Sequence, residues 1–186
     1  MKLDVKNLDE TVALAERLAH CCSSLQSTFV IYLIGELGIG KTALAQGFIQ
    51  YFGFKRVKSP TYSLVESYQN EVINIHHMDC YRLNDPEELE YIGIRDYLLS
   101  GHLQLIEWPE LGKGVIAKAD ISITLSGDGG QRKINIQTHT ELGKQVTKCA
   151  TTYRYFLYCG FLQRVLKTKQ RCTIFVIGRL QIILVS

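Results

Sequence analysis

At 186 residues the chain is long enough for one domain with its own core and too short to expect two. Apolar residues make up 46% and charged residues 21%, a composition that excludes a disordered or fibrous protein. The net charge of +3 is unevenly spread, because residues 1–150 carry 15 Lys and Arg against 18 Asp and Glu, which argues against a basic RNA-binding face on this body.

The first ten residues include Asp4, Asp9 and Glu10, which do not fit the apolar stretch of a secretory signal. We therefore expect a cytoplasmic protein. Its cysteines are expected to be free thiols, because none of them belongs to a C-x-x-C pair. They are Cys21, Cys22, Cys80, Cys149, Cys159 and Cys172. The adjacent His76 and His77 would point to opposite faces of a strand, which argues against a zinc site.

The first half of the chain alternates helical and extended patterns. Apolar side chains recur at helical spacing over Leu8–Cys22, which predicts an amphipathic helix. The apolar run Phe29–Ile34 is typical of a strand buried on both faces, and a helical pattern follows over Lys41–Tyr51. Two extended stretches, Tyr62–Tyr68 and Val72–Met78, flank a polar turn and predict a hairpin.

A helix start follows this hairpin. We expect Asp85 to cap the helix, Pro86 to occupy its first turn, and Gly93 to break it. The apolar stretch Leu103–Ile106 then predicts another buried strand, which ends at Glu107.

A second hairpin is predicted near the end of the body. It joins Ile121–Leu125 to Ile134–Thr138 around the turn Gly127–Gly130. Apolar strands that alternate with helices predict an α/β fold with helices on both sides of the sheet, and the hairpins make that sheet mixed.

The amino-acid composition of the chain changes after about residue 150. Residues 151–186 carry six basic side chains and no acidic ones, and they end in an apolar run, Thr173–Val185, that is too short for a membrane span. We predict one domain over residues 1–150 followed by an atypical basic and apolar tail. Three interpretations of this tail remain open. It is an appendage from a shifted reading frame or from cloning, an extra strand or helix packed on the domain, or a segment that attaches to a membrane surface.

The run Gly35–Thr42 satisfies the P-loop pattern G-x-x-x-x-G-K-[ST] in full, between a buried strand and a helix. The backbone N–H groups of such a loop surround phosphates, Lys41 reaches the β and γ oxygens, and the Thr42 hydroxyl ligates magnesium. We therefore predict a P-loop ATPase domain with a three-layer P-loop NTPase-like fold and a mixed, mostly parallel sheet. The predicted ligands of ATP or ADP are Glu36, Leu37, Gly38, Ile39, Gly40, Lys41, Thr42 and Ala43.

Magnesium needs at least one carboxylate besides Thr42, at the end of a neighbouring strand. Asp79 and Glu107 both end apolar strands and are the two candidates. The sequence leaves open which carboxylate holds the metal and which orients the attacking water.

Several other residues fit a nucleotide site less specifically. Thr61 lies where P-loop proteins keep a loop that senses the γ-phosphate, although Pro60 alone would also explain a turn there. No guanine-reading N-K-x-D tetrad occurs, which favours adenine, and Trp108 either stacks on the base or belongs to the core. Arg82 and Arg95 either stabilise charge or pair with Asp85, Asp96 or Glu88.

Five further motifs follow the P-loop in order, and with them the chain resembles the TsaE (YjeE) family. The motifs are Ser59–Tyr62, His77–Leu83, Asp85–Leu89, Gly93–Tyr97 and Ile106–Glu110. The resemblance covers about residues 1–149, and the tail has no counterpart in it.

The resemblance implies a small ATPase, nearly idle alone, that assists threonylcarbamoyladenosine synthesis on bacterial tRNA together with the TsaD and TsaB proteins. Contact with tRNA would be indirect. By the same resemblance, Thr42 and Asp79 would serve magnesium, Thr61 would sense the γ-phosphate, and Glu107 would help to activate water. Lys41 completes the catalytic set, and Trp108 would lie near the nucleotide or a partner.

Two other functions compete with this interpretation. A small-molecule kinase shares the P-loop but needs an acceptor pocket and usually an arginine-rich lid, and the run from Leu83 to Ser100 holds only Arg95 among many acids. A nucleotide-gated binding module would differ from an ATPase only in its negligible turnover.

Overall fold

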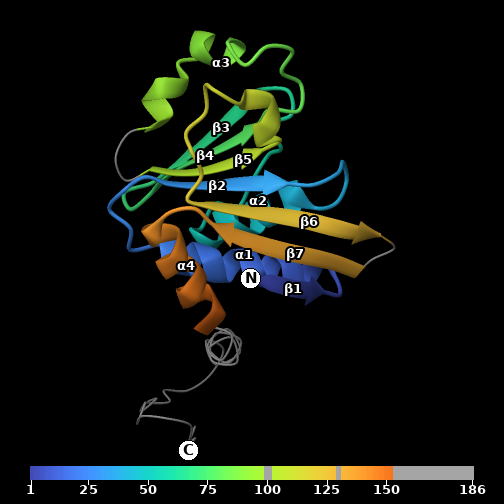
Figure 1. Ribbon diagram of the computed structural model, residues 1–186. Helices are drawn as coiled ribbons and strands as arrows, with labels where there is room; N and C mark the ends of the chain where they lie inside the picture. The colour runs from blue at the N-terminus through green and yellow to red at the C-terminus, as the bar shows by residue number, and fades with distance from the viewer. Residues whose placement is uncertain (99–101, 129–130, 153–186) are drawn as a thin grey trace, which may run out of the picture. The chain divides into compact units, whose positions relative to one another are not determined.

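The computed structural model describes residues 1–98, 102–128 and 131–152 (Figure 1). The predictions for the tail beyond Thr152, for Cys159 and Cys172, and for the turn glycines Gly129 and Gly130 lie outside these residues. The helices are α1 (Leu8–Cys22), α2 (Lys41–Tyr51), α3 (Glu88–Tyr91) and α4 (Glu141–Thr152), with the 3-10 helices η1 (Ile94–Leu98) and η2 (Pro109–Gly112). The strands are β1 (Lys2–Val5), β2 (Phe29–Ile34), β3 (Val65–Gln69), β4 (Asn74–Asp79), β5 (His102–Glu107), β6 (Ile121–Asp128) and β7 (Gln131–Thr138).

The strands form one sheet in the order β1-β7-β6-β2-β5-β4-β3. The neighbours β6, β2, β5 and β4 run parallel, whereas β1, β7 and β3 join antiparallel at the edges. This arrangement confirms the predicted mixed α/β fold, including both hairpins. The P-loop strand β2 lies inside the sheet, and side chains packed against both faces of the sheet bury its apolar residues, as predicted.

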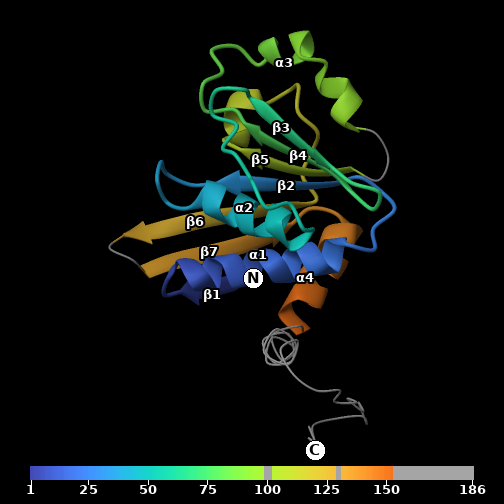
Figure 2. The ribbon, with the colours of Figure 1, turned by 180° about the vertical axis from the view of Figure 1, so that it is seen from behind.

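Alternate residues of β2 enter two separate cores. Phe29, Ile31 and Leu33 pack with α1 and α2 in the larger core, and Figure 2 shows both helices in front of the sheet. Val30 and Tyr32 point the other way, into a smaller core closed by residues of α3, η1 and the chain that follows η2. The helical layer on this second face is therefore made of short helices and loops.

The helices α1 and α2 begin and end at the predicted residues. Asn7 caps α1 by accepting a hydrogen bond from the backbone N–H of Glu10 at 2.9 Å. Gly47 lets α2 approach α1 closely, because a Cβ there would lie 3.2 Å from the Val12 side chain. This contact fixes the helix whose first turn carries Lys41 and Thr42.

The predicted helix start at Asp85 is wrong. The helix α3 begins at Glu88 and has Glu87 at its N-cap, because the Asp85 carboxylate accepts a hydrogen bond from the Glu87 N–H and closes a separate turn first. The break at Gly93 is confirmed, with φ +72° in the left-handed region. Arg95, in the η1 turn beyond it, pairs with Glu90 at 3.0 Å.

One strand and one α-helix were not predicted. The strand β1 is only four residues long, and it extends the sheet by pairing antiparallel with β7. The helix α4 has a low overall hydrophobicity and packs Val146 and Ala150 into the larger core beside α1. The sequence of neither segment indicates which part of the chain it pairs with or packs against.

The expectation that every cysteine is a free thiol is wrong for Cys21 and Cys149. These residues form a disulfide with a Cα–Cα distance of 6.0 Å, because α4 packs against α1. They are 128 residues apart in sequence, so no local spacing predicts the pair. Cys22 and Cys80 are free and buried, and burial raises the pKa of both thiols, that of Cys80 to about 12.

Within the described ranges, the helices are too short or too polar for any of them to cross a bilayer.

Candidate functional site

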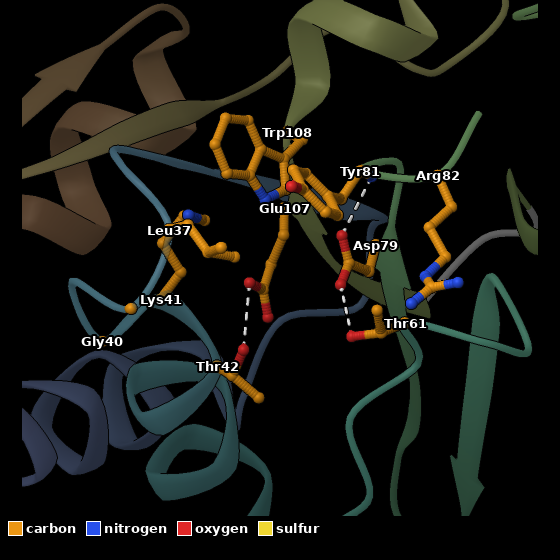
Figure 3. A pocket seen from close by; sticks show the side chains of 11 residues that line it. Leu37, Gly40, Lys41, Thr42, Thr61, Asp79, Tyr81, Arg82, Glu107 and Trp108 are labelled. Carbon is orange, nitrogen blue, oxygen red and sulfur yellow. Dashed lines mark hydrogen bonds between the residues drawn. The ribbon is translucent and has the colours of Figure 1, made fainter. Parts of the chain in front are cut away.

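A cavity of about 460 Å³ opens at the carboxyl ends of β2, β4 and β5 (Figure 3). These strands are parallel neighbours, so whatever follows each of them meets at one edge of the sheet. The loop after β2 leads into α2, β4 ends at Asp79, and β5 ends at Glu107. The cavity is lined by Leu37, Gly38, Gly40, Lys41, Thr42, Thr61, Asp79, Tyr81, Arg82, Glu107 and Trp108.

Two glycines of the P-loop are required by its geometry. Gly35 has φ +146°, and a Cβ there would lie 2.4 Å from the Leu125 carbonyl oxygen of β6. Gly40 forms the N-cap of α2 with φ +111°, in the left-handed region that favours glycine. The loop is also held from β7, because Arg132 Nε donates to the Ile39 carbonyl at 2.8 Å.

Lys41 is 4% exposed and lies across the base of the loop. Its Nζ donates to the carbonyl oxygens of Gly35 at 2.6 Å and Glu36 at 2.9 Å, and it lies 4.0 Å from the centroid of the Trp108 ring. Burial lowers the pKa of Lys41, while the Glu107 and Asp79 carboxylates oppose that shift. An anion in the pocket would find a partly desolvated ammonium group.

Glu107 links the P-loop helix to the sheet. Its Oε2 accepts a hydrogen bond from the Thr42 hydroxyl at 3.1 Å, and its Oε1 lies 2.9 Å from Nε2 of His77. Glu107 is 2% exposed and His77 is fully buried. Both carboxylate oxygens are therefore oriented by the protein, and each keeps a lone pair for a further ligand.

Asp79 is oriented by a different set of donors. Its Oδ2 accepts from the Thr61 hydroxyl at 2.9 Å, and its Oδ1 accepts from the Tyr81 N–H at 3.0 Å. The Thr61 hydroxyl also lies 2.8 Å from that of Ser59. The segment that contains Thr61 is thus tied to the end of β4 at the rim of the pocket.

Trp108 has a left-handed backbone, with φ 53° and ψ 50°. This rare conformation turns the chain sharply after β5, and Figure 3 shows the indole beside Lys41 and Leu37. The ring also packs against Tyr81 at 5.0 Å between centroids. On the opposite rim, the Arg82 guanidinium lies 4.3 Å from the centroid of the Tyr62 ring.

The structure brings most of the predicted site residues into one place. Lys41, Thr42, Thr61, Asp79, Glu107 and Trp108 all line the cavity, together with Leu37, Gly38 and Gly40. The predicted ligands Glu36, Ile39 and Ala43 are not among its lining residues.

Some residues at or behind the pocket were missed at the sequence level. Tyr81 follows Asp79 by two positions, and its place in the motif His77–Leu83 was the available clue. His77 was noted only as part of the motif His77–Leu83 and in a histidine pair that does not suit zinc, and Arg132 lies 93 residues from its partner Ile39 in the P-loop. Contacts of that range require the strand order, which sequence spacing does not provide.

The donor set suits a hard cation that arrives with phosphate. Thr42, Asp79 and Glu107 offer only oxygen atoms, the ligands that magnesium prefers. In the described part of the chain, no three His, Cys, Asp or Glu side chains are grouped to hold a metal by themselves. Magnesium bound with a nucleotide needs fewer protein ligands, because phosphate oxygens and waters complete its octahedron.

Comparison with known proteins gives consistent sequence matches. The family profile described as "Threonylcarbamoyl adenosine biosynthesis protein TsaE" matches residues 5–134. A Haemophilus influenzae protein, "tRNA threonylcarbamoyladenosine biosynthesis protein TsaE", is 45% identical over 122 residues, which cover 65% of this chain and 77% of the relative. The protein of the same name from Bacillus subtilis is 29% identical over 165 residues, or 88% of this chain and 94% of the relative. This last span is longer than residues 1–150, so the alignment enters the segment interpreted as a tail.

A solved structure also shares the fold. The crystal structure of Bacillus subtilis YdiB superposes with a TM-score of 0.67 at 24% sequence identity, covering 82% of this chain and 95% of that one. At this identity the likeness concerns the arrangement of helices and strands.

Proposed function

The chain belongs to the TsaE family, and from this membership and its pocket we propose that it is a magnesium-dependent ATPase that supports threonylcarbamoyladenosine modification of tRNA. The observation that carries the proposal is the convergence of Lys41, Thr42, Asp79 and Glu107 in one cavity behind a complete P-loop. ATP and ADP are the proposed ligands.

Lys41 and the loop would bind the phosphates. A nucleotide would draw the Lys41 ammonium from its carbonyl partners in the loop to the β and γ oxygens, and the N–H groups of the first turn of α2 would bind the same phosphates. Bound magnesium would supply positive charge against the phosphate oxygens. The Thr42–Glu107 hydrogen bond favours these two residues as its main protein ligands.

Asp79 and Thr61 are then the better candidates for the γ-phosphate end of the site. The Thr61 hydroxyl already reaches Asp79, so a γ-phosphate that attracts Thr61 would also change the surroundings of this carboxylate. Asp79 would orient the attacking water or accept its proton. This assignment reverses the roles that the family resemblance implied for Asp79 and Glu107.

Partners follow from the family assignment. We propose that the TsaB and TsaD proteins act with this chain and that tRNA contact is indirect, which is consistent with the balance of 15 Lys and Arg against 18 Asp and Glu over residues 1–150. Arg95, the lid arginine that the kinase hypothesis would use, does not line the cavity and pairs with Glu90. We therefore favour the ATPase.

The test is phosphate release during titration with TsaB and TsaD. The expected result is slow hydrolysis alone and stimulation by the partners, because ordering Ser59–Tyr62 around the γ-phosphate completes the site. Thr61→Ala should abolish the stimulation while retaining most of the basal nucleotide affinity.

Ser63→Ala is the matched control. Its hydroxyl lies in the same loop but donates to Glu66 at 2.8 Å, outside the cavity, so stimulation should persist. Unstimulated hydrolysis, together with unchanged tRNA modification in cells depleted of the protein, would contradict the proposal.

A further inference from the structure

Two consecutive histidines of β4 occupy opposite faces of the sheet. His77 lies on the same face as Asp79 and reaches diagonally across β5, from its neighbour Leu105 toward Glu107. His76 lies on the other face, between Ser67 and His102. Both are buried, with 9% of His76 and 0% of His77 exposed.

His77 is linked to the pocket through one residue. Its Nε2 lies 2.9 Å from Glu107 Oε1, and Glu107 Oε2 accepts from Thr42, so a continuous chain runs from β4 through β5 to the first turn of α2. His77 itself does not line the cavity. It can therefore act on a ligand only by controlling the Glu107 carboxylate.

The other nitrogen of the His77 ring gives the second observation. Nδ1 is buried and has no hydrogen-bond partner among the residues that the structure describes. A carboxylate accepts but does not donate, so Nε2 carries a proton, and Nδ1 is the ring nitrogen left without a partner. A buried polar atom without a partner costs free energy, so the need to fill the core does not explain a histidine at this position.

We propose that His77 is a positioning residue for Glu107. Its Nε2–H fixes Oε1 in the sheet, so that Oε2 stays directed at Thr42 and the pocket. A carboxylate held in this way needs no rotation to receive a cation, and hydrogen bonds behind a metal ligand commonly change metal affinity by about 10- to 100-fold. The inference rests on the proposed function, because it concerns magnesium-dependent nucleotide binding.

The experiment uses the full chain and the fluorescence of Trp108, which is the single tryptophan and lines the cavity. ADP binding is measured at increasing Mg²⁺ and again in the presence of a chelator. His77→Phe should raise the Mg²⁺ concentration for half-maximal binding by about 10- to 100-fold and leave magnesium-free ADP binding unchanged.

Rescue distinguishes positioning from packing. In His77→Gln the amide Nε2 can take the place of the ring Nε2, so the Mg²⁺ requirement should return close to the wild-type value. His77→Asn is polar but too short to reach Glu107, so it should behave like His77→Phe. This Gln and Asn pair also keeps the test decisive if the Phe variant does not fold, which thermal melting would reveal.

His76→Phe is the matched control on the same strand. It removes a buried histidine from the face away from the pocket, so it should change the melting temperature without changing the Mg²⁺ requirement. Wild-type protein without magnesium-dependent ADP binding would overturn the proposed function. If wild type binds as expected, the inference alone is overturned by folded His77→Phe or His77→Asn variants with wild-type Mg²⁺ dependence, or by equal losses in Gln and Asn.

Discussion

Strands β4 and β5 bury polar side chains on both faces, but the two faces differ in what remains available for a ligand. On the cavity face, Asp79 and Glu107 accept hydrogen bonds from Thr61 and Thr42 and keep further lone pairs free. On the other face, the side chains of Asn74, His102, His76 and Ser67 form one chain of hydrogen bonds at 2.9 to 3.1 Å. In that chain every ring nitrogen has a partner, and none of its members lines the cavity.

Burial and polarity therefore do not by themselves identify a functional residue. The hydrogen bonds on the other face can all be satisfied if they run in one direction. Asn74 then donates to His102, His102 donates to His76, and His76 donates to Ser67. The carboxylates of the cavity face cannot satisfy one another in this way, because they only accept. Unused acceptors that point into a cavity are therefore the better indication of a site.

The largest expected effect on the cavity face comes from Lys41→Ala. Removing the ammonium group takes away charge-assisted hydrogen bonds to the phosphates, so ATP affinity should fall by at least about 100-fold. Titration of labelled ATP measures the loss. Gln104→Leu, on the opposite face, is the control and should retain wild-type affinity. Equal affinity for Lys41→Ala and wild type would show that this face is not a nucleotide site.

A smaller effect should separate the two carboxylates within the cavity face. Glu107→Gln should weaken magnesium-dependent binding by about tenfold or more, because it replaces the carboxylate beside Thr42. Asp79→Asn should instead lower turnover and leave that binding nearly intact. Magnesium-dependent affinity and single-turnover hydrolysis are measured for both variants. The opposite pattern would restore the roles implied by the family resemblance, and wild-type behaviour of both would reject a two-carboxylate site.

The smallest effect concerns the stability contributed by the opposite face. Burial, and then the neighbouring His102, lower the pKa of His76 from 6.5 to about 4, and Ser67 and Tyr97 also face its ring. The unfolded chain therefore takes up a proton near pH 6.5 that the folded chain refuses until about pH 4, so stability is full above 6.5 and falls as the pH drops.

Between pH 7.5 and 5.5 this contribution should cost about 1 kcal/mol. Melting temperatures of wild type and His76→Asn across this range provide the measurement, and the variant should show the shallower dependence on pH. Equal slopes would mean that the histidine chain is not a source of acid sensitivity.

The sequence predicts the residues that line the cavity better than the contacts that hold those residues in place. The apolar run before the glycines predicts β2 and α2 with their observed bounds, and acidic residues at the ends of parallel strands predict that Asp79 and Glu107 converge. The hydrogen bond from His77 to Glu107 was not predictable, because it is diagonal and depends on the register of β4 against β5.

Elsewhere the misses have similar physical causes. The disulfide between Cys21 and Cys149 depends on α4, whose few apolar positions give little indication of where it packs. The helix start was misplaced because the Asp85 carboxylate can cap a turn as well as a helix, and only the backbone that follows decides between them.

The disulfide also makes residues 21–149 a closed covalent ring that contains the P-loop, Asp79 and Glu107. A single protease cut inside this ring, for example by trypsin after the exposed Arg56, opens the ring but releases no fragment. On a denaturing gel without reductant, the nicked chain would still migrate as one species, and addition of a thiol would separate it into two. Limited digestion of this protein therefore has to be analysed under reducing conditions before an uncut band is taken as resistance to proteolysis.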